Sequence, residues 1–320
     1  MNSGGITMSN KLENNSIITN IERFGIQRRI VAHMTTKSWK EIPHVTAVYE
    51  PDVTEFYRTF KALQKNYLDS GKDKITFNTV MLKVITEGLK AAPALNSTLK
   101  FNPFTVTGTL TRREDIDISI PWTLPTGEMM TITLPDVQTD SLEQFTKKIQ
   151  KISNKVQNTN CTEAMYEVSF DQTINELKKG NFGVLARVAA AKIGHHKIKL
   201  LSGSEKSKYY EIPSDDRLTL NDLRQGTVTI SNIGSIHRSF TGYLAMLEII
   251  PPQIFTVGIC NTQVKPLSIL HDDGTYTVES RTVCPMCLAG DHRAIDYGDM
   301  VPFIDRLDDI FEHPEQIIKW

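Results

Sequence analysis

DHRAID, residues 291–296, is the segment on which the interpretation of this 320-residue sequence depends. The apolar run 282–288 before it has the composition of a buried strand, and residues 299–311 after it carry apolar side chains at helical spacing. Histidine has an ordinary pKa near neutrality, so His292 is a natural proton acceptor for a thiol or hydroxyl nucleophile. A core histidine with satisfied hydrogen bonds is the alternative, and the spacing alone does not decide between them.

Four segments upstream of this motif have apolar residues at the three- and four-residue spacing of amphipathic helices. They are the region from residue 21 to 34 and residues 54–68, 76–92 and 141–156. Pro93 marks the end of the third segment. Ser141 opens the fourth, and Gln144 three residues later is typical of a capping box.

Runs rich in β-branched and aromatic residues predict strands between these helices. The expected strands are residues 44–49, 104–110, 116–122, 129–134, 227–232 and 254–260, with another running from about residue 275 toward the motif. The combination of helices with antiparallel-looking strands predicts an α+β sandwich.

The composition excludes several classes of function. A formal net charge of -1, with 23% charged and 40% hydrophobic residues, argues against nucleic acid as a partner. No apolar run approaches the roughly 20 residues that span a bilayer, and the N-terminus lacks the order of a secretory signal. Four cysteines do not make a disulfide framework in a chain this long, so we expect a cytoplasmic protein.

Cys284 and Cys287 have the CxxC spacing of a zinc or redox half-site. A structural zinc site needs four ligands, and the other two cysteines, Cys161 and Cys260, are isolated. Cysteine also behaves as a small apolar residue in protein cores. We therefore favour a buried strand here and expect no metal site.

Two regions stand apart from the regular pattern. Residues 1–20 are rich in Asn, Ser and Gly, which predicts a disordered tail before a single domain at residues 21–320. Residues 161–215 break the regular pattern and contain the apolar and basic run 182–201. An amphipathic lid or subunit contact is the favoured interpretation of that run, and a membrane surface is the less favoured one. The pair His195-His196 within it is expected at a surface or interface.

The chain from about residue 21 resembles the catalytic core of the dihydrolipoamide acyltransferases of 2-oxo acid dehydrogenase complexes, relatives of chloramphenicol acetyltransferase. Their signature is Asp-His-Arg-x-x-Asp-Gly followed by a helix, and four positions match: Asp291, His292, Arg293 and Asp296. Further segments look similar to the family: residues 28–34 with 42–44, 75–96, 116–137 and the glycine-flanked strand 226–234. The resemblance implies a chloramphenicol acetyltransferase-like two-layer sandwich, with a mixed sheet and flanking helices.

The resemblance also implies a CoA-dependent acyltransferase that moves an acyl group between coenzyme A and a thiol acceptor such as dihydrolipoamide. By position, His292 is the general base and Ser231 the hydroxyl donor to the tetrahedral oxyanion. Asp296 is an orienting residue, with Arg28 the better candidate for its partner and Arg29 close behind. Asn232 next to the serine is expected in the substrate site.

Family members form trimers with the site between subunits. The resemblance therefore implies a homotrimer or a multiple of trimers, with His292 from one chain and Ser231 from its neighbour. No metal is implied.

The match to the family fails in three informative places. Residues 161–215 are longer than the loop that the resemblance implies there, which makes this stretch an insertion. Tyr297 replaces the glycine of the signature and Gly298 follows, so either the turn shifts by one residue or the ring narrows the substrate channel. The sequence shows no lipoyl domain, so we expect no lipoyl group on this chain and allow for a separate lipoyl-bearing protein. A small-molecule O- or N-acyltransferase and a non-catalytic trimeric scaffold remain the alternatives.

Overall fold

The structure, a computed structural model, describes residues 12–13, 16–17, 23–124, 127, 129–178, 180, 182–193 and 197–320. The predicted tail, residues 1–20, lies almost wholly outside these ranges. Within it, β1 (Leu12–Glu13) and β2 (Ser16–Ile17) pair as a short antiparallel ladder. The prediction of disorder there remains untested.

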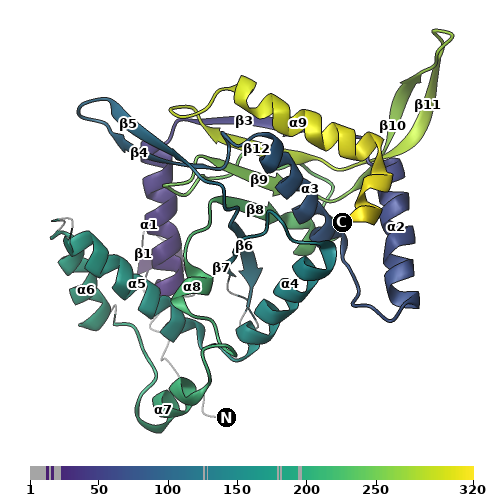
Figure 1. Cartoon of the computed structure of the whole chain (residues 1–320). Helices are drawn as coiled ribbons and strands as arrows, with labels where there is room; N and C mark the ends of the chain where they lie inside the picture. The colour runs from purple at the N-terminus through teal and green to yellow at the C-terminus, as the bar shows by residue number, and fades with distance from the viewer. Residues whose placement is uncertain are drawn as a thin grey trace.

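A six-stranded mixed sheet forms the centre of the molecule (Figure 1). Its order is β3 (His44–Tyr49), β12 (Met286–Asp291), β9 (Phe255–Ile259), β8 (Val228–Asn232), β6 (Ile118–Thr123) and β7 (Met129–Leu134). The β6–β8 and β8–β9 pairs are parallel and the other three are antiparallel. The expected α+β sandwich with a mixed sheet is confirmed.

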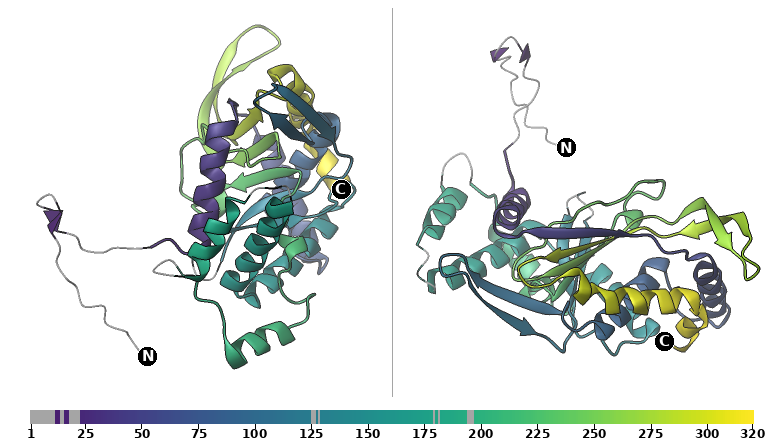
Figure 2. Two further views of the ribbon diagram at one scale, coloured as in Figure 1. Left: turned by 90° about the vertical axis from the view of Figure 1, so that its left-hand side faces the viewer. Right: turned by 90° about the horizontal axis from the view of Figure 1, so that it is seen from above.

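Helices cover both faces of this sheet (Figure 2). One face carries α2 (Thr54–Asp69), α3 (Phe77–Ala91), α4 (Leu142–Gln157) and α9 (Tyr297–Glu312), and the other carries α1 (Ile26–Glu41). The expected capping box opens α4, because the Ser141 hydroxyl accepts from the Gln144 N–H at 3.2 Å and the Ser141 N–H donates to Gln144 Oε1 at 2.8 Å. A short 3₁₀ helix, η3 (Pro314–Lys319), ends the chain.

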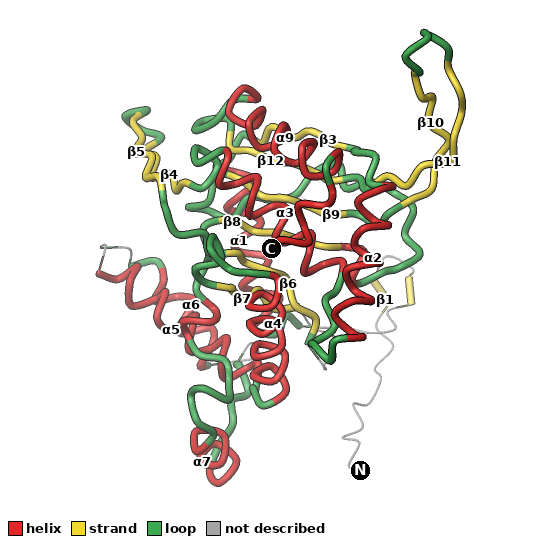
Figure 3. Tube along the Cα trace, turned by 45° about the vertical axis from the view of Figure 1, so that its right-hand side comes forward, coloured by secondary structure: helices red, strands yellow, loops and turns green. Residues whose placement is uncertain are grey.

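Two predicted strands were wrong in detail. Residues 103–106 form a turn between β4 (Ser97–Asn102) and β5 (Thr107–Arg112), because the Asn102 side-chain oxygen accepts the Phe104 N–H at 2.9 Å. The strand expected from residue 275 to the motif is two strands, β11 (Tyr276–Val283) and β12, separated at Cys284-Pro285. β11 pairs with β10 (Gln263–Leu270) in a hairpin that projects from the body (Figure 3).

The CxxC pair lies in the core, as the strand interpretation predicted, although Cys284 falls just outside the strands. Cys260, Cys284 and Cys287 are buried free thiols. Burial raises the pKa of Cys284 to about 12 and that of Cys287 to about 11, which keeps both thiols protonated and unreactive at neutral pH.

The described part of the insertion folds as separate helices. These are α5 (Cys161–Lys178), α6 (Val184–Lys192), α7 (Gly203–Glu211) and α8 (Leu220–Leu223). α5 packs against α1 and α6 packs against α5. The pair His195-His196 lies outside the described residues. None of the described helices is long and apolar enough to cross a membrane.

Candidate active site

His292 stands one residue beyond the C-terminal end of β12. Its backbone N–H donates to the Pro43 carbonyl oxygen at 3.0 Å, which ties this position to the segment that leads into β3. The side chain is 55% exposed. The alternative of a sealed core histidine is therefore excluded for the single chain.

The ring of His292 is held in one tautomer by two acceptors. Its Nδ1 lies 3.3 Å from the carbonyl oxygen of Ile295 and 3.1 Å from a carboxylate oxygen of Asp296. Because both neighbours accept, Nδ1 carries the proton in the neutral ring. Nε2 then keeps its lone pair, and no described residue bonds to it. The imidazole is arranged to take a proton at Nε2.

A buried ion pair fixes the turn that presents this histidine. Asp291 is 1% exposed, and its carboxylate accepts Arg293 Nε at 2.9 Å and a terminal guanidinium nitrogen at 2.7 Å. The guanidinium also lies 5.0 Å from the ring centroid of Phe101. The Asp291 carbonyl accepts the N–H groups of Ala294 and Ile295. The motif therefore builds its own rigid turn.

Asp296 is the N-cap of α9, and its N–H donates to Asp299 Oδ2 at 2.9 Å. Tyr297 is the first helical residue and 57% exposed, so its ring reaches solvent in the single chain. A Cβ on Gly298 would meet nothing within 4 Å, and neither residue has a positive φ. No backbone constraint at this turn requires the family glycine, so the tyrosine is tolerated.

Ser231, on β8, lines a cavity of about 730 Å³ between α1, β7, β8 and residues 247–250. Its hydroxyl has no hydrogen-bond partner among the described residues. Of the neighbouring hydroxyls in the same cavity, Thr229 donates to Gln253 and Thr256 donates to the Thr229 carbonyl. Thr131 on β7 also lines the cavity and, like Ser231, has no hydroxyl partner among the described residues. We had not predicted these threonines, although the two-residue spacing of Thr229 and Ser231 signals a shared face.

The other predicted site residues divide between these two places. Arg28 lines the cavity of Ser231 and forms no hydrogen bond or ion pair with Asp296 in the described chain. Arg29 donates through Nε to the Phe24 carbonyl. Asn232 is committed locally, because its Nδ2 donates to Asn78 at 2.7 Å and its side-chain oxygen caps the 3₁₀ turn η2 (Ile233–Ser235). Their roles toward a substrate remain predictions.

A single chain does not bring His292 and Ser231 together. The sheet register aligns Ser231 with Gly258, and Gly258 with Cys287. His292 lies five residues beyond Cys287, which at the rise of a strand is about 16 Å along the sheet. Proton acceptor and hydroxyl donor thus occupy different parts of the surface of one chain.

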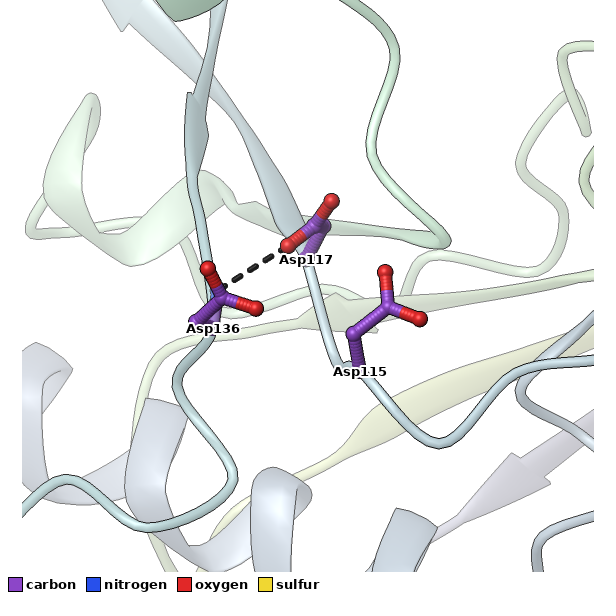
Figure 4. A group of neighbouring side chains, drawn as sticks. All are labelled: Asp115, Asp117 and Asp136. Atoms are coloured by element: carbon purple, nitrogen blue, oxygen red, sulfur yellow. Dashed lines mark hydrogen bonds between the residues drawn. The ribbon is translucent and has the colours of Figure 1, made fainter.

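Three carboxylates form the one group among the described residues that has the spacing of cation ligands (Figure 4). Atoms of Asp115, Asp117 and Asp136 lie within 4.8 Å of one another. Asp117 is already paired with Arg224 at 2.8 Å and accepts the Asp136 N–H at 2.9 Å. The guanidinium of Arg113 lowers the pKa of Asp115. These local partners account for two of the carboxylates, and the cluster carries no assignment.

The model of the 2-oxoacid dehydrogenases acyltransferase (catalytic domain) family matches residues 16–189 and 204–319 of the chain. The chain belongs to this family. The match leaves out residues 190–203, within the insertion.

Relatives of this acyltransferase domain agree with that assignment. The chain is 25% identical over 293 residues to the dihydrolipoyllysine-residue acetyltransferase component of the pyruvate dehydrogenase complex of Buchnera aphidicola subsp. Schizaphis graminum, covering 90% of this chain and 53% of that protein. The chain spans about half or less of the length of the curated relatives that it matches over most of its own length.

Solved structures show the same fold at lower identity. The dihydrolipoamide acetyltransferase of Azotobacter vinelandii is 20% identical with a TM-score of 0.60, over 93% of this chain and 94% of that one. The same values describe a structure of the cubic core of the pyruvate dehydrogenase multienzyme complex. The predicted family fold is confirmed.

Proposed function

We propose that this domain transfers an acyl group between coenzyme A and a thiol of the dihydrolipoamide type. One observation carries the proposal: His292 is exposed, with Nδ1 held by two acceptors and Nε2 open. The imidazole takes the proton of the incoming thiol at Nε2. The thiolate attacks the thioester carbonyl, the tetrahedral oxyanion collapses, and the other thiol leaves with the proton returned by His292.

Ser231 is proposed as the hydroxyl donor to that oxyanion. Its hydroxyl is free, it sits on a strand inside the sheet, and it faces a cavity large enough for an acyl group. A donor on a rigid element needs little reorganisation when negative charge develops on the oxygen.

The site forms between two copies of the chain in this proposal. The roughly 16 Å between the two residues along the sheet rules out a joint action within one chain. A three-fold assembly would set His292 of one copy against the Ser231 cavity of the next. The cubic core of one structural relative supports a trimer, because cubic symmetry contains three-fold axes.

The catalytic histidine in the Azotobacter relative was studied together with a serine and an asparagine. In that protein the asparagine follows the histidine by four positions, which is the spacing of Asp296 after His292. The serine there precedes the histidine by 52 positions, against 61 here. The correspondence supports the roles of His292, Ser231 and Asp296, with a longer connection in this chain.

Thiol release from acyl-CoA, with dihydrolipoamide as acceptor, tests the proposal. His292→Ala should lower kcat by about 10²–10⁴-fold because general base catalysis is lost. His271→Ala, at the β10–β11 hairpin, is the matched control and should leave the rate unchanged. A panel of hydroxyl and amine acceptors run in parallel identifies the acceptor class. Equal background rates in wild type and His292→Ala would contradict catalysis by this residue.

A further inference from the structure

α6 presents apolar side chains on both of its faces. Val184 is fully buried, and α6 packs against α5. The outer stripe consists of Leu185 on α6, Phe182 before the helix and Ile193 just after it, which are 51%, 69% and 74% exposed. A helix on a soluble surface normally places polar residues on its outer side. The outer stripe of α6 is therefore an uncovered apolar surface.

The neighbouring helix α5 is acidic, with Glu163, Glu167, Asp171 and Glu176, and is not part of this surface. α5 and α6 stand together beside α1, at the margin of the molecule and away from α9 and β12 (Figure 1). The patch is thus separate from the turn that carries His292.

The segment that carries this patch has charge of one sign. Residues 178–204 contain six Lys or Arg and no Asp or Glu, although the whole chain has a net charge of -1. Since the segment contributes +6, the other residues carry -7. Lys178, Lys192, Lys197 and Lys199 are exposed in the described part of this segment. An apolar stripe bordered by cations matches the headgroup and acyl boundary of an anionic membrane.

We propose that α6 and its flanking residues dock the protein on an anionic phospholipid surface, with Phe182, Leu185 and Ile193 entering the headgroup layer. A second copy that presents the same segment in a two-fold contact is a poorer occupant, because six positive charges would face six. Contact with a different face of another copy is an outcome of the test. The exposed outer stripe of α6 thereby favours a membrane surface, which the sequence alone made the less favoured interpretation of residues 182–201.

Cosedimentation with vesicles tests this docking. The wild type should pellet with equal parts of phosphatidylcholine and phosphatidylglycerol, and not with phosphatidylcholine alone. Binding should weaken as salt is raised, because the Debye length falls from about 30 Å at 0.01 M to about 3 Å at 1 M. No pelleting, or equal pelleting on neutral vesicles, would overturn the proposal.

Single substitutions separate the apolar and the charged contributions. Leu185→Asp should weaken vesicle binding tenfold or more, whereas Phe104→Asp, at a 95% exposed position in the β4–β5 turn, should not. Lys192→Glu should weaken binding about fivefold or more, against no change for Lys100→Glu on β4. Unchanged binding of Leu185→Asp, in a variant with wild-type thermal unfolding, would exclude insertion of the stripe.

Size-exclusion chromatography without lipid tests whether another copy of the chain, rather than a membrane, covers α6. The oligomeric state of Leu185→Asp should equal that of the wild type. A smaller particle for this variant would show that α6 contacts another copy instead, and that outcome also overturns the proposal.

Discussion

At the scale of single residues, backbone geometry determines the chemistry of His292. A carbonyl acceptor from Ile295 and the carboxylate of Asp296 both face Nδ1, so the proton-accepting nitrogen is the one that points away from the turn. The exposed carboxylate adds little energy of its own, because pairs open to water are screened. Its contribution is orientation of the ring.

Replacing Ser231 measures the value of the free hydroxyl. Ser231→Ala should lower kcat by about 10²–10³-fold with little change in KM, because the donor acts on charge that exists only in the transition state. Ser235→Ala, whose hydroxyl bonds only to the local Asn232 carbonyl, is the control. Steady-state kinetics with acyl-CoA gives both constants. A rise in KM at constant kcat would assign Ser231 to substrate binding instead.

Replacing Asp291 tests the turn. Asp291→Ala should lower the free energy of unfolding by about 3 kcal/mol, because Arg293 is left partly buried without its carboxylate. Urea denaturation measures this change, with Asp272→Ala at the exposed β10–β11 turn as control. A loss below about 0.5 kcal/mol would mean that the ion pair does not hold the turn.

The family signature predicts roles for His292 and Asp296, and the resemblance of the strand 226–234 predicts one for Ser231; these roles remain predictions. The sequence did not indicate the Ile295 carbonyl as an acceptor, since a backbone atom leaves no trace in composition. It also did not show that the Asp291 and Arg293 side chains pair with each other, because their role depends on the path of the turn.

At the scale of elements, α3 and α9 pack closely against each other, and α9 begins at the turn that carries His292. Gly88 on α3 faces Leu307 and Phe303 of α9, and a Cβ there would lie 2.5 Å from a Leu307 methyl carbon. The absence of a side chain at this position permits the contact. The start of α9 then fixes Asp296 beside the histidine.

Gly88→Ala should destabilise the protein by about 1–3 kcal/mol, because overpacking outweighs the gain in helix propensity of about 1 kcal/mol. Gly298→Ala, where a Cβ meets nothing within 4 Å, is the matched control and should be neutral or slightly stabilising. Thermal and urea unfolding compare the two. Equal changes in the free energy of unfolding for both substitutions would mean that α3 and α9 can move apart without a loss of stability.

Elements with clear periodicity were predicted well, and hairpins were not. α2, α3 and α4 match the expected ranges closely because each has a continuous apolar stripe. β10 was missed because Pro266 and Lys265 interrupt its pattern, and proline normally demotes a strand to an edge. β4 was missed because the turn that ends it depends on one side chain, Asn102, whose oxygen accepts the Phe104 N–H.

At the scale of the whole molecule, the sheet holds His292 and Ser231 apart, although the proposed reaction needs both residues at one site. β8 carries the proposed hydroxyl donor and the end of β12 leads to the proposed base, with β9 between them. Sequence spacing gives no distance between two strands, so only the register shows that Ser231 and His292 lie far apart in one chain. The family resemblance, rather than the residues themselves, supplied the expectation of a subunit boundary.

Co-expression of two inactive variants tests that boundary most directly. Mixed assemblies of His292→Ala and Ser231→Ala chains contain boundaries at which both native residues meet, so thiol release should recover to about one quarter of the wild-type rate under random mixing. Each variant expressed alone should remain at its own low rate. Mixed oligomers with no activity above that of the separate variants would contradict a site shared between neighbouring chains.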